Sequence, residues 1–287
     1  MPDLEHIIID GGSTDGTLEI LKRYPHLKWV SEKDRGIAEA LNKGLRMAAG
    51  DVIGWINSDD MYLPGAFRTV ERFFDGHPDA MVLVGRARVL DAYGRPLFDQ
   101  QEPRPEGYTH RGMVRFWKNP TLPQPSVFFR RPALETAGLA DESLPAYMDY
   151  DLFLRMSRLF VFHRTGEFLS AIHLHDRSGS VRDIASGRLH KKLLAISRKY
   201  WEQSDRLSFE WHRPRIAWAA YYDRFAFAVK ARTGGRKPEK ISWGLLWGLR
   251  RELLGYPPAA AVAGLKWLAR RAFQAAGRGF AGGLERP

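Results

Sequence analysis

The chain has 287 residues, no cysteine and a formal net charge of +11. This length supports one sizeable core with an appendage, and the lack of cysteine excludes a disulfide framework and thiolate chemistry. No apolar stretch reaches the length of a bilayer span. We therefore expect a cytoplasmic protein.

Strand and helix patterns alternate over the first 56 residues. The β-branched run 7–9 ends at Asp10, and a Gly-rich turn and a helix at 18–24 follow it. A second strand leads to Ser31, a second helix follows, and the apolar run 52–56 closes the series. This alternation predicts an α/β sheet with parallel strands flanked by helices.

An acidic tetrad, Asn57-Ser58-Asp59-Asp60, comes directly after the apolar run 52–56. In open α/β sheets, ligands bind beyond the carboxyl ends of the strands. Adjacent carboxylates repel each other unless a cation shares their site, and Mg²⁺ is usually held by one or two carboxylates plus substrate phosphates. On these residues alone, a polar turn before the helix that Pro64 opens is an equal alternative.

The next 110 residues or so continue the α/β pattern. The Pro/Gly-rich stretch 92–107 predicts a flexible loop over the site. The other predicted elements are helices at 64–74, 111–117 and 149–158 and strands at 81–90 and 126–129, and a further run at 168–172 precedes His173.

Several motifs occur in a fixed order and resemble those of the family 2 inverting glycosyltransferases of the GT-A fold. The resemblance covers residues 3–176. It rests on Asp10-Gly11-Gly12-Ser13-Thr14-Asp15, Asp34-Arg35-Gly36, Asn42-Lys43-Gly44, the acidic tetrad, the stretch 123–131 and Met148-Asp149-Tyr150-Asp151-Leu152.

The resemblance implies a GT-A (Rossmann-like), mostly parallel sheet and a nucleotide-diphosphate sugar as donor. It implies that Asp59 and Asp60 hold Mg²⁺ or Mn²⁺ against the diphosphate, with His175 as a further candidate ligand. Asp10 and Asp34 would contact the nucleoside. Asp149 would be the catalytic base.

Each of these roles has a structural alternative. Asp149 could cap the helix that it opens, and Asp151 could favour the helix dipole. His173 and His175 could be ordinary loop histidines, since His is a frequent but not an obligatory metal ligand. Asp15 is expected to bond local turn amides.

Two departures from the family pattern concern the nucleotide site. The family's first strand and helix are expected to be missing ahead of Met1, either through a misplaced start codon or through a natural truncation. Gly11 stands where many family members carry a second Asp that contacts the base. The nucleotide is therefore left open.

Charge divides the chain at residue 176. Residues 1–176, the expected transferase domain, have a net charge of −4, whereas residues 177–287 have 23 Lys/Arg against 8 Asp/Glu and six of the nine tryptophans. The stretch 262–273 has the pattern of a basic amphipathic helix. A helical region that contacts an anionic membrane surface and a solvated helical subdomain both fit this composition. No nucleic-acid motif accompanies the charge, so nucleic acid is not expected.

Together these observations predict a metal-dependent inverting glycosyltransferase, peripheral at the inner face of the plasma membrane. Its acceptor would be a hydroxyl of a glycan or lipid-linked molecule in cell-surface polysaccharide assembly. One alternative is an impaired remnant that acts as a membrane or partner adaptor. A sugar nucleotidyltransferase is less favoured, because the first strand lacks its Gly-rich, Arg/Lys-bearing phosphate loop.

Overall fold

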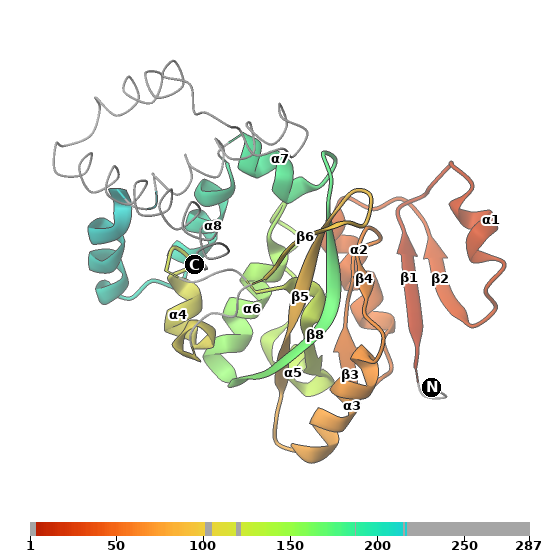
Figure 1. The fold of residues 1–287 in the computed structure, drawn as a ribbon, viewed down its shortest axis with the longest axis horizontal. Helices are drawn as coiled ribbons and strands as arrows, with labels where there is room; N and C mark the ends of the chain where they lie inside the picture. Colours follow the sequence, from red (N-terminus) through yellow and green to blue (C-terminus); the bar gives the residue numbers. More distant parts are fainter. Residues whose placement is uncertain (1–3, 101–104, 119–121, 187, 215, 217–287) are drawn as a thin grey trace, which may run out of the picture. The chain divides into compact units, whose positions relative to one another are not determined.

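The computed structural model describes residues 4–100, 105–118, 122–186, 188–214 and 216 (Figure 1). The strands are β1 (His6–Asp10), β2 (Leu27–Ser31), β3 (Val52–Gly54), β4 (Met61–Tyr62), β5 (Val82–Asp91), β6 (Pro96–Asp99), β7 (Val127–Arg130) and β8 (Phe162–Leu174). The helices are α1 (Thr17–Leu21), α2 (Ile37–Met47), α3 (Ala66–Gly76), α4 (His110–Val114), α5 (Arg131–Ala137), α6 (Met148–Leu159), α7 (Gly179–Ala185) and α8 (Leu189–Arg198).

The described strands form two sheets. β1 and β2 pair in parallel, and a six-stranded sheet has the order β3-β7-β5-β8-β4, with β6 paired to β5. Helices flank the larger sheet (Figure 1). The predicted α/β class is confirmed.

The larger sheet is mixed, which corrects the expected mostly parallel arrangement. β5 and β8 are parallel, but β7 runs antiparallel between β3 and β5, and β4 runs antiparallel to β8. β3, β5 and β8 consequently point the same way. Alternation along the sequence predicts that β7 is a strand, but it contains no information on the strand's direction.

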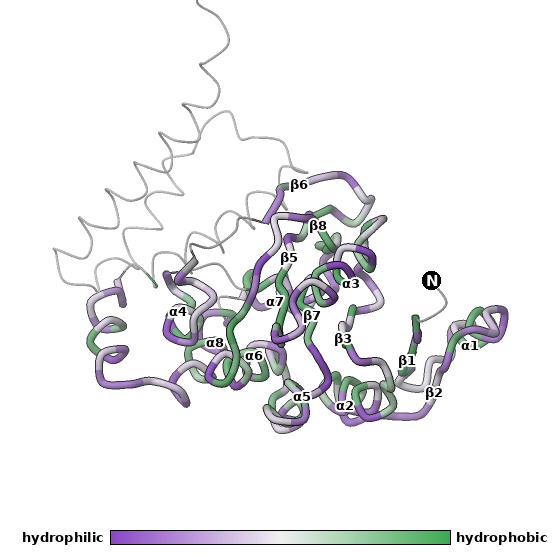
Figure 2. Tube along the Cα trace, turned by 90° about the horizontal axis from the view of Figure 1, so that it is seen from below, coloured by the Kyte–Doolittle hydropathy of each residue, from purple (hydrophilic) through white to green (hydrophobic). Residues whose placement is uncertain are grey.

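The pair β1–β2 has no hydrogen-bonded neighbour in the larger sheet. β1 lies between β2 and β3 in both views (Figures 1 and 2), yet among the described residues β1 pairs with β2 alone and β3 with β7 alone. Each strand therefore has one unpaired edge, and such edges favour the addition of another strand. The predicted absence of a first strand and helix stays a prediction.

Apolar side chains cover both faces of the larger sheet. One face packs against α3, whose Ala66, Val70 and Phe74 recur at every fourth residue and contact Leu83, Phe128 and Leu169. The other face packs against α6 through Phe129, Trp55 and Phe153. The sheet is therefore covered by α3 on one side and by α6 on the other.

The stretch 92–107 contains ordered secondary structure, which corrects the predicted flexible loop. After a turn at Gly94, where φ is +77°, β6 returns along β5 and pairs Phe98 with Val89. A tight turn with a glycine in the left-handed region is a hairpin signal. β6 is exposed throughout, so its sequence lacks the alternation that marks a half-buried strand.

The chain divides into two compact units. The first comprises Met1–Arg182 and Lys191–Asp205, and the second comprises Asp183–His190 and Arg206–Pro287. Residues 191–205 thus fold with the larger unit. The predicted domain division at residue 176 stays a prediction, because most of the C-terminal region, including the amphipathic stretch 262–273, lies outside the described residues. Within the described ranges, no helix combines the length and apolarity needed to cross a membrane.

Candidate active site

Three of the predicted site residues lie at one edge of the larger sheet. β3, β5 and β8 all end at this edge, Asp59 and Asp60 follow β3, and His175 follows β8. The two chain segments are joined directly, since the His173 amide donates to Asp60 Oδ1 at 3.0 Å. The carboxyl end of the sheet is the expected place for a ligand site in this fold class.

Asp60 is the perturbed member of the acidic pair. Burial raises its pKa to about 6, and the neighbouring charge of Asp59 adds to the rise, while the hydrogen bond from the His173 amide opposes it. A carboxylate in such a place is poorly compensated when ionised. A bound cation would compensate the negative charge of Asp60.

Asp59 is more exposed and contacts His175. The distance from His175 Nε2 to Asp59 Oδ2 is 3.0 Å. His175 Nδ1 accepts a hydrogen bond from the Arg177 amide at 3.2 Å, which orients the ring. The structure therefore brings Asp59, Asp60 and His175 together, as predicted. Their role as metal ligands stays a prediction.

The loop that carries the acidic pair is held by three contacts. Trp55 stacks on Phe153 of α6, with ring centroids 5.4 Å apart. Gln124 Nε2 donates to the Trp55 carbonyl at 2.7 Å, and Asn57 Nδ2 donates to Gln124 Oε1 at 3.4 Å. These contacts fix the end of β3 relative to α6.

The residues at this edge fit a divalent cation that a substrate phosphate helps to hold. No group of three His, Cys, Asp or Glu side chains in the described part of the chain forms a complete metal cage. His173 Nδ1 is buried beside Asp60 with no hydrogen-bond partner. Mg²⁺ sites commonly use one or two carboxylates and take their other ligands from phosphate and water. This donor set agrees with that pattern.

Asp149 lies in the first turn of α6, as predicted. Burial raises the pKa of its carboxyl, whereas bonds from the amides of Asp149 and Tyr150 lower it. Tyr147, two residues before Asp149, has a φ of +61°. Among the described residues it is the one non-glycine residue with a positive φ. Strained backbone of this kind persists where the surroundings hold it, often at functional sites.

Asp151 has a different role from Asp149, because it is committed to contacts that the sequence analysis did not predict. It is 3% exposed, and it accepts hydrogen bonds from Arg155 Nε at 3.1 Å and from Tyr200 OH at 3.0 Å. Lys199 Nζ lies 3.5 Å from Asp151 Oδ1. Residues 199 and 200, beyond the resembling region, thus anchor the helix that carries Asp149. The spacing of four residues between Asp151 and Arg155, which is typical of an ion pair along one helix face, was the sequence signal for this contact.

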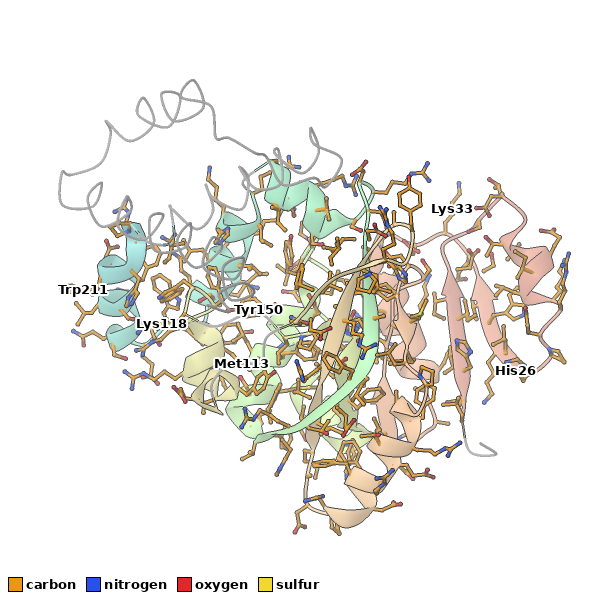
Figure 3. The ribbon with its side chains drawn as sticks, in the orientation of Figure 1. His26, Lys33, Met113, Lys118, Tyr150 and Trp211 are labelled. Atoms are coloured by element: carbon orange, nitrogen blue, oxygen red, sulfur yellow. The ribbon has the colours of Figure 1, made fainter. Side chains whose placement is uncertain are left out.

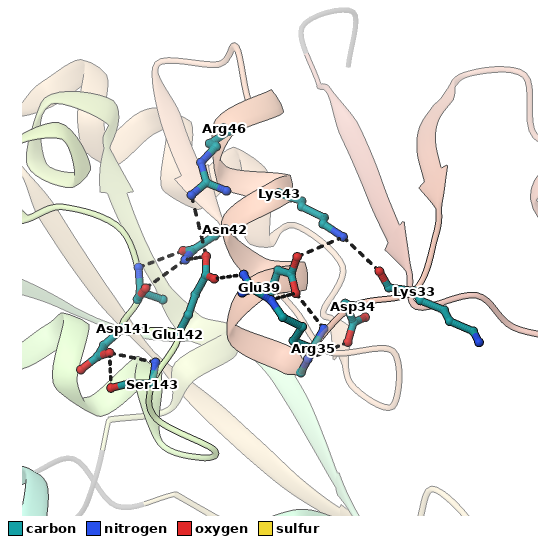
Figure 4. A network of polar contacts seen from close by, with 12 residues as sticks. Lys33, Asp34, Arg35, Glu39, Asn42, Lys43, Arg46, Asp141, Glu142 and Ser143 are labelled. Carbon is teal, nitrogen blue, oxygen red and sulfur yellow. Dashed lines mark hydrogen bonds and ion pairs between the residues drawn. The ribbon is translucent and has the colours of Figure 1, made fainter.

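The loop before α6 is clamped by α2 (Figure 4). Asn42 is 1% exposed, donates to the Ala140 carbonyl and accepts from the Ala140 amide, both at 2.9 Å. Its Nδ2 also donates to Glu142 Oε1 at 2.9 Å, and Arg35 pairs with Glu142 Oε2 at 2.9 Å. On the other side, Arg155 donates to the Leu139 carbonyl at 2.8 Å. The approach to Asp149 is therefore held from two helices.

Asp10 and Asp34 lie at the carboxyl ends of β1 and β2. Asp10 accepts from the Gly12 and Ser13 amides and from the Ser31 hydroxyl, and bonds of this kind, foremost from the Ser13 hydroxyl, lower its pKa to about 2. Asp34 Oδ2 would lie 2.7 Å from a Cβ at Gly11, so Asp34 occupies the space that a side chain there would need. Asp34 thus lies against the residue that follows Asp10. The contact of Asp10 and Asp34 with a nucleoside stays a prediction.

The glycosyl transferase family 2 model matches residues 1–138. This match contains α2, the acidic pair and β7, and the helix with Asp149 follows it. The chain carries a family 2 glycosyltransferase domain. Its recognition from the motifs is confirmed.

Some curated relatives of this glycosyltransferase domain are named for polysaccharide synthesis. Chondroitin synthase of Escherichia coli is 26% identical over 63% of this chain and 26% of its own length. Succinoglycan biosynthesis protein ExoU of Rhizobium meliloti is 28% identical over 67% of this chain and 60% of its own. The chain thus spans less than two thirds of either relative.

A mannosyltransferase of Pyrobaculum calidifontis, solved with GDP-Man and Mn²⁺, has a similar fold. It superimposes with a TM-score of 0.54 over 91% of this chain and 76% of that chain, at 18% identity. At this identity the likeness shows the fold alone. The α/β class and the GT-A arrangement are confirmed.

The raised pKa of Asp60 predicts how stability depends on pH. The folded-state pKa of about 6 lies above the unfolded value of 3.8, so the fold is stabilised by protonation below pH 3.8 and loses that stability as the pH rises through 6. Asp60→Asn removes the buried charge and keeps an acceptor for the His173 amide. We expect this variant to melt at a higher temperature than the wild type at pH 8, with the difference shrinking towards pH 4.

The matched control is Asp75→Asn on the exposed face of α3. Its melting temperature should follow that of the wild type at each pH. A destabilised Asp60→Asn at pH 8 would contradict the assignment of an uncompensated buried carboxylate.

Proposed function

We propose that this protein is a metal-dependent inverting glycosyltransferase that moves a sugar from a nucleotide-diphosphate sugar to an acceptor hydroxyl. The observation that carries the proposal is that two sets of carboxylates lie on separate elements of the fold. Among the described residues, Asp59 and Asp60 at the sheet edge have no Lys or Arg partner, and Asp149 lies on the separate helix α6. Family membership supports glycosyl transfer, and the GDP-Man and Mn²⁺ of the similarly folded enzyme support the donor class and the metal.

In the proposed reaction, Asp149 accepts the proton of the acceptor hydroxyl while that oxygen attacks the anomeric carbon. The bond from this carbon to the diphosphate oxygen breaks on the opposite face, so the configuration inverts. A general base works best when its pKa lies near the working pH. The raised pKa of Asp149 moves it in that direction.

Asp59 and Asp60, with His175 beside them, would hold Mg²⁺ or Mn²⁺. The cation would stabilise the charge of the leaving diphosphate. Asp10 and Asp34, at the ends of β1 and β2, would position the nucleoside. The relatives chondroitin synthase and succinoglycan biosynthesis protein support a glycan or lipid-linked acceptor and a role in cell-surface polysaccharide assembly.

The decisive variant is Asp149→Asn. Donor binding should stay near that of the wild type, while turnover should fall by roughly two orders of magnitude or more, because a general base typically contributes that much. The wild-type rate should rise with pH along a limb set by the raised pKa of Asp149, and the residual rate of the variant should lack this limb. Release of nucleoside diphosphate from a panel of UDP-, GDP- and dTDP-sugars measures the rate.

Asp151→Asn is the comparison on the same helix. Removing one partner of a buried ion pair costs about 3 kcal/mol or more, so this variant should lose thermal stability. Unchanged turnover in Asp149→Asn would show that Asp149 is only a helix cap. Absence of turnover in the wild type, with intact donor binding, would favour the adaptor alternative.

Metal-dependent donor binding forms a separate prediction. Calorimetric titration with UDP, GDP and dTDP should give binding that requires Mn²⁺ or Mg²⁺, because the carboxylates need the cation to hold a diphosphate. Asp60→Asn should lose the metal-dependent part, whereas Asp75→Asn should keep it. Equal affinity in Asp60→Asn and the wild type would rule out Asp60 as a ligand.

We further propose that the C-terminal region contacts the inner face of the plasma membrane. Residues 177–287 have a net charge of +15. In the helical residues 203–214, Leu207 and Trp211 are four apart and 69% and 78% exposed (Figure 3). Basic charge with an exposed apolar stripe favours an anionic bilayer surface, at about 1 kcal/mol per basic residue near the surface.

The full chain should therefore sediment with vesicles that contain anionic lipid. High salt should release it in part, since surface attraction is screened over about 8–10 Å at moderate ionic strength. A chain ended after residue 216 keeps residues 191–205 in the first unit and should bind less. If the full chain does not sediment with anionic vesicles at low salt, the membrane proposal is wrong and the C-terminal region is better described as a solvated helical subdomain.

A further inference from the structure

Two arginines of β5 gather around one aromatic ring of β8. The guanidinium carbon of Arg86 lies 4.0 Å from the centre of the Phe168 ring, and that of Arg88 lies 5.0 Å from the same centre. Phe168 is paired opposite Arg86 in the sheet. Like charges brought this close repel each other, and the aromatic ring offsets this repulsion only in part.

Neither arginine has its charge fully compensated. Arg86 Nε is buried with no hydrogen-bond partner, and no ion pair involves this guanidinium among the described residues. Arg88 has one carboxylate nearby, that of Asp99 at 4.0 Å, and both side chains are more than half exposed. A buried donor without an acceptor is costly and calls for an explanation.

The pair faces the side of the sheet that carries the proposed base. A Cβ at Gly85 would collide with Leu169, which belongs to the cluster under α3. Because side chains alternate along a strand, Arg86 points to the opposite face, where α6 packs. The burial of β5 agrees, since Ala87 and Val89 are buried while Arg88 is exposed.

Arg86 is set back along β5 from the proposed metal site. His173, whose amide bonds Asp60, is paired with Leu90, four residues beyond Arg86 and two beyond Arg88. At about 3.3 Å per residue, Leu90 is about 13 Å along the strand from Arg86 and about 7 Å from Arg88. The titration with nucleoside diphosphate described below therefore separates an anion site at the arginines from the donor diphosphate.

We infer that Arg86 and Arg88 bind an anionic oxygen group, a phosphate or a carboxylate, carried by the acceptor. Arginine forks match both groups through paired, charge-assisted hydrogen bonds. The acceptor hydroxyl must reach Asp149, and α6 and Arg86 share one face of the sheet. The assignment to the acceptor rests on the proposed function, whereas the anion site rests on the arginines themselves.

The test titrates the full-length protein with inorganic phosphate and, separately, with free glucuronate, in EDTA so that no metal-held diphosphate site contributes. Nuclear magnetic resonance of the arginine Nε–H groups reports binding at the buried Nε of Arg86, and glucose is the neutral comparison. At least one anion should shift this signal saturably and glucose should not. Arg86→Gln and Arg88→Gln should each weaken binding at least tenfold, the usual share of a charge-assisted hydrogen bond.

Arg95→Gln is the matched control. Arg95 lies on the same hairpin and stacks over Tyr93 at 5.2 Å, but it is paired with Asp91 at 2.7 Å. Its loss changes the net charge equally and should leave anion binding unchanged. Equal weakening by Arg86→Gln and Arg95→Gln, or no saturable binding of either anion, would overturn the inference. If Arg86→Gln unfolds at too low a temperature to be titrated, Arg86→Lys replaces it, because this variant keeps the positive charge. Anion binding by Arg86→Lys at wild-type affinity would also contradict recognition by a guanidinium fork.

The same variants are titrated with nucleoside diphosphate and Mn²⁺. Unchanged affinity in Arg86→Gln supports an anion site apart from the donor. Loss of donor binding together with phosphate binding would assign the anion to the donor and overturn the inference. If the wild type binds no nucleoside diphosphate but retains Arg86-dependent anion binding, the proposed function fails and the anion site stands.

Discussion

The parallel pairing of β8 with β5 is the constraint on which the proposed metal site and the inferred anion site both depend. The two strands pair from Val82 with Phe162 to Asp91 with Leu174, and the register shifts on either side of Arg86. The far end of β8 places the His173 amide on Asp60 and His175 on Asp59. The middle of the same pair places Phe168 against Arg86 and Arg88. One strand pair thus sets the spacing between the proposed cation site and the inferred anion site.

The helix α6 depends on polar contacts more than on its own propensity. Its start has a strained residue, Tyr147, and the preceding loop contains no regular structure. Asn42 holds this loop from α2, and Asp151 links the helix to Arg155 and Tyr200. These bonds are buried or partly buried, and a satisfied polar network in such a place restricts a segment to one arrangement. The position of Asp149 is therefore set by residues that are distant from it in the sequence.

The sequence predicted the elements better than their mutual geometry. Periodicity located the strands and helices of the α/β unit, because their apolar residues face α3 or α6 at regular intervals. It missed β6, whose residues are all exposed, and it could not give the antiparallel direction of β7. The acidic pair was expected at the carboxyl edge of the sheet because ligands bind there in open α/β sheets, whereas His175 was expected beside it only from the family resemblance.

Asp149 and Asp151 show where such inference ends. Both are acidic residues in the first turn of α6, and sequence position alone gives each the same helix-dipole benefit. Their surroundings separate them: Asp151 faces Arg155, Lys199 and Tyr200, whereas Asp149 lacks a cationic partner among the described ion pairs. A carboxylate already committed to two cations and a hydroxyl is a poor proton acceptor, because its charged form is strongly stabilised. The partners of Asp151 are residues 155, 199 and 200, two of which lie far along the chain, so only the folded structure shows that Asp151 is held in these contacts.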